Sequence, residues 1–481
     1  MSVLAIDAGT TGVTALVVGE DGRVRSRGYQ EFAQHFPRPG WVEHAPEEIW
    51  QAVLASAKDA LRGQQVSAVG VTNQRETAVL WDRRTLAAPR RAVVWQDRRS
   101  AGICDTLQAA GHGPRVTELT GLRLDPYFTA TKLAWLAEHE PDTWQGVTDG
   151  STVVGTVDSY VVARLSGGRR HVTDASNASR TLLFDLHAAG WSAELCELFG
   201  VPLSALPEVV PSYGQVARTD PDAFLGLDLP VSGIAGDQQA ALFGQGCFTP
   251  GASKCTYGTG SFVLVNTGTQ PVQSSAGLLT TVAWMSPSGE VVYALEGAVF
   301  VTGAAVQWLR DGLQLIGSAQ EIEALAASVP DSGGVVFVPA LTGLGAPDWD
   351  PDARGAVLGI TRGTTRAHLA RATLEAIAYE VRDVVDVMVA EAGVALPALQ
   401  VDGGASANNL LCQLQADQLD VPVRRPQLLE TTALGAAFLA GLGSGVWSSP
   451  DELAGSWLLD REFAPANGVR NGAGHARWRE A

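Results

Sequence analysis

The chain has 481 residues, of which 46% are hydrophobic and 18% charged, and its net charge is −17. That length predicts two domains with a globular composition, and the negative charge argues against nucleic acid or an anionic membrane as a partner. We expect no membrane insertion and a cytoplasmic location, because no apolar run reaches about 18 residues and no signal peptide precedes the first strand. The five scattered cysteines are expected to be reduced.

The first strand and the turn that follows it have a pattern that suits phosphate binding. Two apolar, β-rich runs flank Asp7-Ala-Gly-Thr-Thr-Gly12, which predicts a tight hairpin whose glycines let the backbone approach a ligand closely. Successive N–H groups and the Thr10 and Thr11 hydroxyls suit phosphate oxygens. Asp7, at the end of a buried strand, is placed to hold a metal bound to those phosphates. Taken alone, such a pattern is more often only a turn.

A second copy of this pattern lies near the middle of the chain, in Cys255-Thr-Tyr-Gly-Thr-Gly-Ser-Phe-Val-Leu-Val-Asn266. Two such hairpins predict two related domains that hold one nucleotide from both sides. We place the boundary in the segment 245–256, which gives domains at residues 1–248 and 249–481. Lysine is nearly absent and no G-x-x-x-x-G-K-[ST] occurs, so the phosphate site is not that of a P-loop NTPase.

Strands and helices alternate along the rest of the chain. Apolar runs predict strands over residues 66–72, 78–82, 92–96, 230–237, 334–339 and 399–402. Helical spacing predicts helices over residues 46–61, 101–110, 130–138, 238–243, 303–315 and 366–391. Residues 466–481 are expected to form a loosely held polar tail.

Phosphoryl transfer needs phosphate-binding amides, a metal carboxylate and an acid beside the acceptor hydroxyl. Asp237 follows an apolar strand, where it is either a general base or the N-cap of the next helix, and spacing favours neither. The pair Arg75-Glu76, also at a strand end, is a surface pair or, if a pocket forms there, a clamp for a polyol. Trp95 and Tyr127 are more often core aromatics than ligand contacts.

Several segments together resemble the glycerol kinase family of carbohydrate kinases. The most specific are Asn73-Gln-Arg-Glu-Thr77 and Val94-Trp-Gln-Asp-Arg-Arg99. The others are Asp7-x-Gly-Thr-Thr, Asp125-Pro-Tyr-Phe128, Asn177-Ala-Ser-Arg-Thr181, Gly233-Ile-Ala-Gly-Asp-Gln-Gln239, Thr256-Tyr-Gly-Thr-Gly260, Tyr293-Ala-Leu-Glu-Gly-Ala298, Gly343-Leu-Gly-Ala-Pro347 and Asp402-Gly-Gly-Ala405. The resemblance extends from residue 3 to about residue 447.

The resemblance implies an α/β protein with two actin-like (ribonuclease H-like) ATPase domains and a nucleotide and substrate cleft between them. It implies ATP-dependent phosphorylation of glycerol to sn-glycerol 3-phosphate, with ATP and Mg²⁺ as cofactors and glycerol and ATP as partners. A homodimer or a homotetramer is compatible with it, and the sequence does not decide the oligomeric state.

Carried over by position, the resemblance also implies the site residues. Asp237 becomes the catalytic base and Asp7 the magnesium-associated acid. The implied glycerol contacts are Arg75, Glu76, Trp95, Tyr127, Asp237, Gln238 and Phe262. The implied nucleotide contacts are Thr10, Thr11, Thr259, Gly303, Gln307, Gly404 and Asn408. The set is chemically consistent, because charged and phenolic groups suit hydroxyls while aromatic rings cover a carbon backbone.

Two stretches depart from the pattern. The first loop continues Gly9-Thr-Thr-Gly-Val-Thr14 where glycerol kinases usually have Gly-Thr-Thr-Ser-Ser-Arg, so an arginine near the transferring phosphate is missing. Residues 217–230 match the basic loop through which fructose 1,6-bisphosphate inhibits some bacterial members of the family. Here the loop has one arginine, Arg218, against three aspartates, and we predict that it does not bind the bisphosphate.

Two other functions stay open. A kinase for another small polyol or a ketose, such as erythritol or xylulose, is the nearer alternative, although the aromatic walls Trp95 and Phe262 count against larger substrates. An actin-like or chaperone-type ATPase is the more distant one. It predicts an appended peptide-binding domain and no arginine–carboxylate acceptor pocket.

Overall fold

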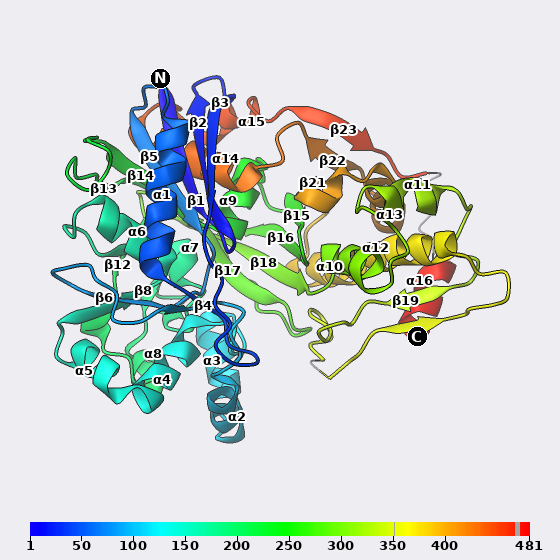
Figure 1. The fold of residues 1–481 in the computed structure, drawn as a ribbon, viewed down its shortest axis with the longest axis horizontal. Helices are drawn as coiled ribbons and strands as arrows, with labels where there is room; N and C mark the ends of the chain where they lie inside the picture. The colour runs from blue at the N-terminus through cyan, green and yellow to red at the C-terminus, as the bar shows by residue number, and fades with distance from the viewer. Residues whose placement is uncertain (351, 467–471) are drawn as a thin grey trace.

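Two mixed sheets organise the molecule, and the computed structural model describes residues 1–350, 352–466 and 472–481 (Figure 1). The first sheet has the strand order β13–β14–β5–β1–β2–β3. Its strands are β1 (Ser2–Ala8), β2 (Gly12–Gly19), β3 (Val24–Glu31), β5 (Ala68–Asn73), β13 (Tyr213–Arg218) and β14 (Pro230–Gly236).

The register of the first sheet brings three strand ends together. β1 runs parallel to β5, and β5 runs parallel to β14. Ala8 pairs with Asn73, and Asn73 pairs with Gly236, so the three carboxyl ends lie level at one edge. Residues that end or directly follow these strands therefore meet at this edge, where open α/β sheets bind their ligands.

The second sheet repeats the core of the first, with a β-hairpin whose first strand is parallel to the next strand along. Its order is β17–β18–β16–β15–β21–β22–β23. Its strands are β15 (Ser253–Tyr257), β16 (Ser261–Gly268), β17 (Leu279–Met285), β18 (Val291–Val299), β21 (Leu399–Asp402), β22 (Val423–Pro426) and β23 (Leu459–Phe463). The hairpin β15–β16 corresponds to β1–β2, and β21 corresponds to β5. This repetition agrees with the predicted pair of actin-like domains.

Helices cover both faces of the first sheet, as the alternation of its apolar side chains requires. Leu4 and Ile6 face α1 (Pro46–Ala60) and α6 (Val157–Leu165). Val3 and Ala5 belong to the cluster on the other face, which includes α9 (Asp237–Gly244) and α14 (Thr431–Ser444). Helix α14 comes from the end of the chain, so distant sequence completes the first core (Figure 1).

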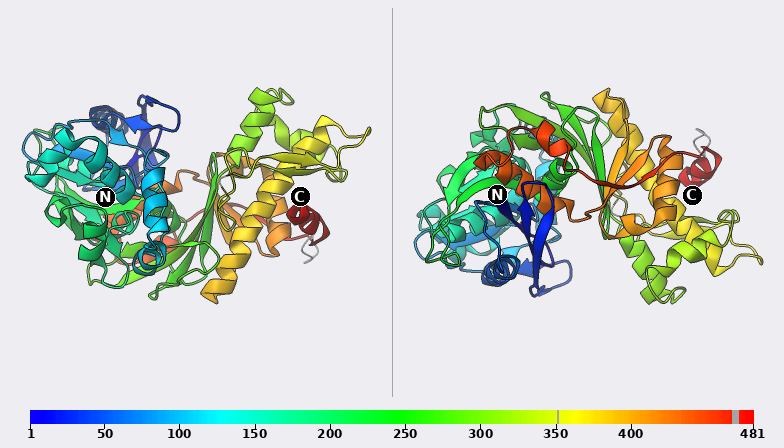
Figure 2. Two further views of the ribbon diagram at one scale, coloured as in Figure 1. Left: turned by 90° about the horizontal axis from the view of Figure 1, so that it is seen from below. Right: turned by 90° about the horizontal axis from the view of Figure 1, so that it is seen from above.

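The second sheet packs differently on its two faces. Cys255, Val263 and Leu295 face the long helix α12 (Arg366–Ala392) and α13 (Asn409–Leu419), and Figure 2 shows α12 on the outer side of the sheet. On the opposite face, Leu264 and Ala294 join the cluster that contains α9 and α14. That inner face is therefore turned toward the first sheet and its ligand edge.

Smaller elements surround the two sheets. A side lobe around residues 78–206 carries β6 (Val79–Asp82), β7 (Ala92–Val93), α2 (Ala101–Ala109), α3 (Gly113–Thr120), α4 (Thr129–His139), α5 (Pro141–Thr148), β8 (Thr152–Gly155), β9 (Val172–Asp174), α7 (Ala175–Ala178), β10 (Phe184–Asp185), β11 (Gly190–Trp191) and α8 (Ala193–Leu198). Elsewhere lie β4 (Glu43–His44), β12 (Glu208–Val210), α10 (Gly303–Gln307), α11 (Glu321–Ala327), β19 (Val336–Val338), β20 (Ala356–Leu358), α15 (Pro450–Ala454) and α16 (Gly472–Glu480).

Three predicted elements differ from the observed ones. The α-helix predicted over 303–315 is shorter than expected: α10 ends at Gln307, and a π-helical turn follows over Trp308–Gly312. The strand predicted over 92–96 is only the two residues of β7. The predicted polar tail is wrong for residues 472–480, which form α16 with Trp478 buried; residues 467–471 lie outside the described part of the chain. Trp478 anchors the helix by donating to the Phe337 carbonyl (2.9 Å).

The boundary between residues 248 and 249 stays a prediction. Within the described part of the chain, none of the helices has the length and apolar character needed to cross a membrane.

Candidate active site

Two carboxylates meet at the ligand edge of the first sheet. Asp7 is the second-last residue of β1, and Asp237 directly follows β14 as the first residue of α9. Burial raises the pKa of Asp7 to about 8, and the neighbouring Asp237 carboxylate adds to the rise. Burial also raises the pKa of Asp237. The register thus brings two carboxyl groups together where the sequence predicted a metal and a base.

The Arg75-Glu76 pair is not a surface pair. Arg75 and Glu76 are only 3% and 1% exposed, because the chain turns inward after β5. The Thr77 N–H donates to the Arg75 carbonyl (2.7 Å), which closes a three-residue turn and leaves Glu76 with a φ of 59°. A non-glycine residue in this region is strained, and such strain gathers at functional sites. The pair is therefore buried beside Asp237, and its role as a clamp for a polyol stays a prediction.

Arg75 contacts several other predicted acceptor residues. Its Nε lies 3.1 Å from Asp237 Oδ1 and 3.8 Å from Glu76 Oε1. Its Nη2 lies 3.5 Å from the hydroxyl of Tyr127. Burial raises the pKa of Tyr127 far above its usual value, so the phenol stays neutral. The guanidinium thus joins one base candidate and one phenol.

Asp237 is not the N-cap of α9, because Gly236 occupies that position. The Asp237 Oδ1 accepts from the Gln238 N–H (2.7 Å) and faces Arg75. Its side chain is 28% exposed, so a ligand can reach it. The next side chain, Gln238, accepts a hydrogen bond from the buried Lys254 amine, which also donates to Thr256 Oγ1 (2.9 Å). This contact joins β15 of the second sheet to the edge of the first.

Trp95, one of the two predicted aromatic walls, contacts a residue of the predicted acceptor site. Trp95 and Tyr127 form an edge-to-face pair with ring centroids 5.7 Å apart. The Trp95 indole also donates to Thr10 Oγ1 (3.0 Å) in the first phosphate loop. Trp95 therefore links Tyr127 to the first hairpin loop, and its role as a wall of the acceptor site stays a prediction.

Phe262 reaches the same region from the second sheet. It lies opposite Thr256 on β15 and opposite Ala298 on β18. Because alternate residues share a face, Phe262 lies on the face that also carries Lys254 and Glu296. That is the inner face of the sheet, and Phe262 is half-buried there.

The predicted phosphate loops are the turns of the two hairpins. Thr10 and Thr11 lie between β1 and β2, and Thr259 lies between β15 and β16. The second turn packs on the start of α10, since the Gly303 N–H donates to the Gly258 carbonyl (3.0 Å) and the Ala304 N–H donates to the Thr259 carbonyl (3.0 Å). A Cβ at position 303 would lie 2.6 Å from that Gly258 oxygen, so glycine is needed for the close approach.

The remaining predicted nucleotide contacts lie near the exposed end of the second sheet. Gln307 ends α10 with an exposed side chain. Gly404 is exposed, and a Cβ there would meet no atom within 4 Å. Asn408 caps α13, because its Oδ1 accepts from the Leu411 N–H (2.9 Å). No contact joins these three residues to the acceptor pocket among the described residues, and their roles stay predictions.

Sequence reasoning assigned no role to Glu296, Arg180 and Lys254. All three are fully buried against the acceptor residues. Glu296 lies inside the apolar strand β18, and a lone acid in such a strand was the available signal. The Glu296 and Arg180 positions even lay within the segments that carried the resemblance.

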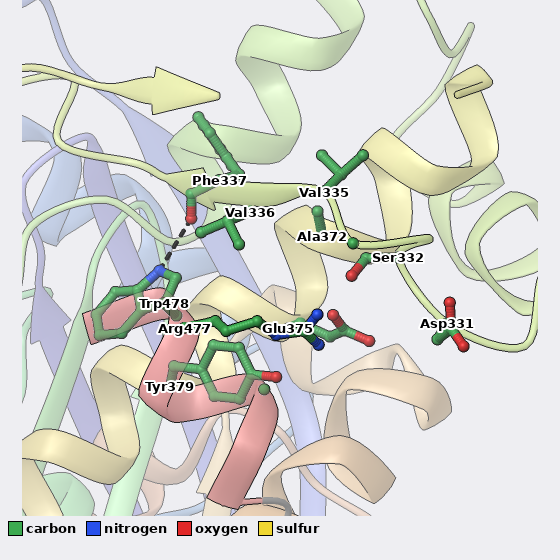
Figure 3. A pocket seen from close by; sticks show the side chains of 12 residues that line it. Asp331, Ser332, Val335, Val336, Phe337, Ala372, Glu375, Tyr379, Arg477 and Trp478 are labelled. Atoms are coloured by element: carbon green, nitrogen blue, oxygen red, sulfur yellow. Dashed lines mark hydrogen bonds between the residues drawn. The ribbon is translucent and has the colours of Figure 1, made fainter. Parts of the chain in front are cut away.

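A separate cavity of about 310 Å³ lies between α12, β19 and α16 (Figure 3). Tyr379, Trp478 and Phe337 line it, together with Glu375, whose carboxylate is paired with Arg371 (2.8 Å). It contains none of the predicted acceptor or nucleotide contacts.

Paired hairpin sheets with a buried arginine–carboxylate pocket at their junction define an actin-like phosphotransferase. The model of the FGGY family of carbohydrate kinases matches the chain in both of its parts, the N-terminal domain over residues 2–244 and the C-terminal domain over residues 253–444. The chain belongs to this family and is a carbohydrate kinase.

Within the family, the chain is similar over its whole length to glycerol kinases. It is 56% identical to the glycerol kinase of Dechloromonas aromatica (100% of this chain, 96% of the relative) and 51% identical to glycerol kinase 2 of Thermotoga maritima (100% and 97%). The structure of Plasmodium falciparum glycerol kinase with ADP superposes with a TM-score of 0.92 at 32% identity, covering 100% of this chain and 96% of that one.

Proposed function

We propose that the protein transfers the γ-phosphoryl group of ATP to glycerol and forms sn-glycerol 3-phosphate. The observation that carries this proposal is the cluster around the Arg75 guanidinium, which lies within 3.5 Å of both Asp237 and the Tyr127 hydroxyl. Charged and phenolic groups there suit vicinal hydroxyls. Trp95 and Phe262 supply apolar surface for a short carbon chain.

Each residue of the pocket has a separate task in this mechanism. Asp237 accepts the proton of the attacking hydroxyl, and Arg75 and Glu76 hold the other hydroxyls in place. Gln238 and Tyr127 complete the polar contacts. Thr10, Thr11 and Thr259 present the two hairpin loops to the phosphates, while Gly303, Gln307, Gly404 and Asn408 surround the rest of the nucleotide.

We also propose Mg²⁺ as the metal of the reaction. Asp7 fits it, because its carboxylate lies at the phosphate loop and within electrostatic reach of Asp237. Mg²⁺ prefers oxygen ligands and is usually bound by one or two carboxylates together with substrate phosphates. When bound, the ion neutralises charge on the transferring phosphoryl group.

The domain division 1–248 and 249–481, a cytoplasmic location and a homodimer or homotetramer remain part of the proposal. Five free, buried cysteines agree with a reducing compartment. The two family matches, over 2–244 and 253–444, agree with the proposed division.

A panel of acceptors tests the substrate. The purified protein would be assayed for ADP release with glycerol, erythritol, xylulose and no acceptor, at fixed ATP and Mg²⁺. We expect glycerol to give the highest kcat/KM by at least about tenfold, because one extra carbon against an apolar wall costs on the order of 1–3 kcal/mol. A higher kcat/KM with erythritol or xylulose would replace glycerol as the substrate.

A further inference from the structure

A closed network of four buried charges lies behind the acceptor pocket. Arg180 and Glu296 are fully buried, and Arg75 and Glu76 are nearly so. The Arg75 fork spans Glu296, with Nη1 2.5 Å from Oε2 and Nη2 3.0 Å from Oε1. Arg180 bridges the two acids, with Nη2 3.0 Å from Glu296 Oε1 and Nε 2.7 Å from Glu76 Oε1. The network therefore pairs two guanidinium groups with two carboxyl groups, and Asp237 contacts it only through Arg75 Nε.

The network joins parts of the chain that are far apart. Arg75 follows β5 of the first sheet, Arg180 follows α7 in the side lobe, and Glu296 lies in the middle of β18 in the second sheet. Burial alone would raise the pKa of Glu296, but Arg180 and Arg75 outweigh it and lower the pKa to about 2. The acid is thus ionised and committed to the two arginines.

Glu296 and Asp237 compete for the same guanidinium. Glu296 accepts one N–H from each Nη atom and so fixes the end of the fork, while Asp237 faces the side of the guanidinium through the single Nε contact at 3.1 Å. A bidentate arginine–carboxylate pair is stronger and more rigid than a single contact. Without Glu296, the fork of Arg75 would be free to turn onto Asp237 and to cover the carboxylate that must meet the acceptor hydroxyl.

We propose that Glu296 and Arg180 are positioning residues for the acceptor: Glu296 holds the fork of Arg75 away from Asp237, and Arg180 holds Glu296 and Glu76 in register. The inference rests on the proposed function, since the acceptor is the proposed glycerol. Neither residue is exposed to a ligand, so both act through Arg75 and Glu76. The substrate site is therefore oriented by an acid of the second sheet.

Steady-state kinetics of Glu296→Gln test the proposal, because the amide keeps the size of the side chain and removes its charge. We expect the KM for glycerol to rise roughly 10- to 100-fold and kcat to fall, since a displacement of about 1 Å can cost 100-fold. The KM for ATP should stay within about twofold. Glu296→Asp, which keeps the charge, should recover part of the loss.

Matched variants separate positioning from simple destabilisation. Asp158→Asn changes another buried acid, which accepts from Thr156 (2.5 Å) and Thr173 (2.7 Å) away from the pocket, and it should leave both KM values unchanged. Arg180→Lys keeps a charge but cannot span two carboxylates, so it should raise the KM for glycerol as Glu296→Gln does. If Glu296→Gln does not fold, the kinetics of Arg180→Lys test the proposal instead.

Three outcomes would overturn the proposal. The first is a KM for glycerol within twofold of the parent value in both Glu296→Gln and Arg180→Lys. The second is an equal rise of the KM for ATP, and the third is that neither variant yields folded protein, which would make the network structural. If the parent protein itself does not phosphorylate glycerol, the proposed function fails instead, and the two failures are thereby distinguished.

Discussion

Asp237 carries the chemical step in the proposed mechanism, at a position where it faces Arg75 and remains 28% exposed. Asp237→Asn should keep the fold and ATP binding but lower kcat roughly 10²- to 10⁴-fold, because the amide cannot accept the hydroxyl proton. Rates at saturating glycerol and ATP measure this, and circular dichroism checks the fold. A kcat within about threefold of the parent would assign the base to another residue.

Trp95 contacts Tyr127 of the proposed acceptor site and Thr10 of the proposed phosphate loop, so its two contacts need separate variants. Trp95→Phe removes the indole bond to Thr10 and keeps an aromatic wall beside Tyr127. We expect it to raise the KM for ATP more than that for glycerol. Trp95→Ala opens the wall and should also raise the KM for glycerol and relax selection against erythritol, by on the order of 1–3 kcal/mol. Identical effects of the two variants on the KM for glycerol would show that Trp95 does not form an apolar wall of the glycerol site.

Individual site residues could be predicted from the sequence wherever a polar residue follows an apolar strand. Asp7, Arg75 and Asp237 were predictable as neighbours for that reason, although spacing could not separate a base from an N-cap. The role of Glu296 was not predictable, because its partners Arg75 and Arg180 are defined only by the packing of β18 against another sheet. A lone acid in an apolar strand indicates some partner and does not identify it.

Among the helices and strands, α16 could not be predicted from the sequence. Its composition is polar, and a single buried side chain, Trp478, docks it against β19 and α12 (Figure 3). His475 and Arg479 add ion pairs with Asp383 of α12 (2.6 and 2.9 Å), and one buried apolar side chain leaves no helical apolar stripe to detect. The long helix α12 was predictable within one residue, since its buried positions recur at helical spacing over the whole 27-residue length.

Trp478→Ala should therefore destabilise the second half of the molecule without changing the acceptor site. The loss of a buried tryptophan costs about 3 kcal/mol or more, while Trp478→Phe, which removes the hydrogen bond to Phe337 and part of the ring but keeps an aromatic side chain, should cost less. Thermal unfolding monitors both. A changed KM for glycerol in Trp478→Ala, or an unchanged unfolding temperature, would show that α16 has another role.

The connection between β13 and β14 contains the loop that we predict not to bind fructose 1,6-bisphosphate. Its one arginine, Arg218, is paired with Asp228 (2.5 Å), and Asp220 is paired with Arg169 (2.8 Å). No convergent set of free donors is left for two phosphates. Activity at saturating glycerol and ATP should stay constant up to millimolar bisphosphate. Saturable inhibition that Arg218→Ala abolishes would refute this.

Over the whole molecule, the repeated hairpin was the feature that predicted the architecture. Two copies of one strand–turn–strand pattern imply two related sheets, and the sheets indeed share the arrangement of β1, β2 and β5 with β15, β16 and β21. The hairpin pattern could not predict that α14 packs on the first sheet. Apolar residues lie on all sides of this helix, so its sequence does not indicate which element it packs against. The proposed acceptor residues lie where this shared core brings the two sheets together, at the contact between Arg75 and Glu296.

The identity and handedness of the product test the proposed function most directly. The reaction with glycerol, ATP and Mg²⁺ would be run to completion and the product oxidised with an NAD⁺-dependent dehydrogenase specific for sn-glycerol 3-phosphate. A chiral pocket built from Arg75, Glu76 and Asp237 predicts one NADH for each ADP formed. A yield near one half would mean that the pocket does not distinguish the two terminal hydroxyls, and no NADH would mean that glycerol is not phosphorylated at this position.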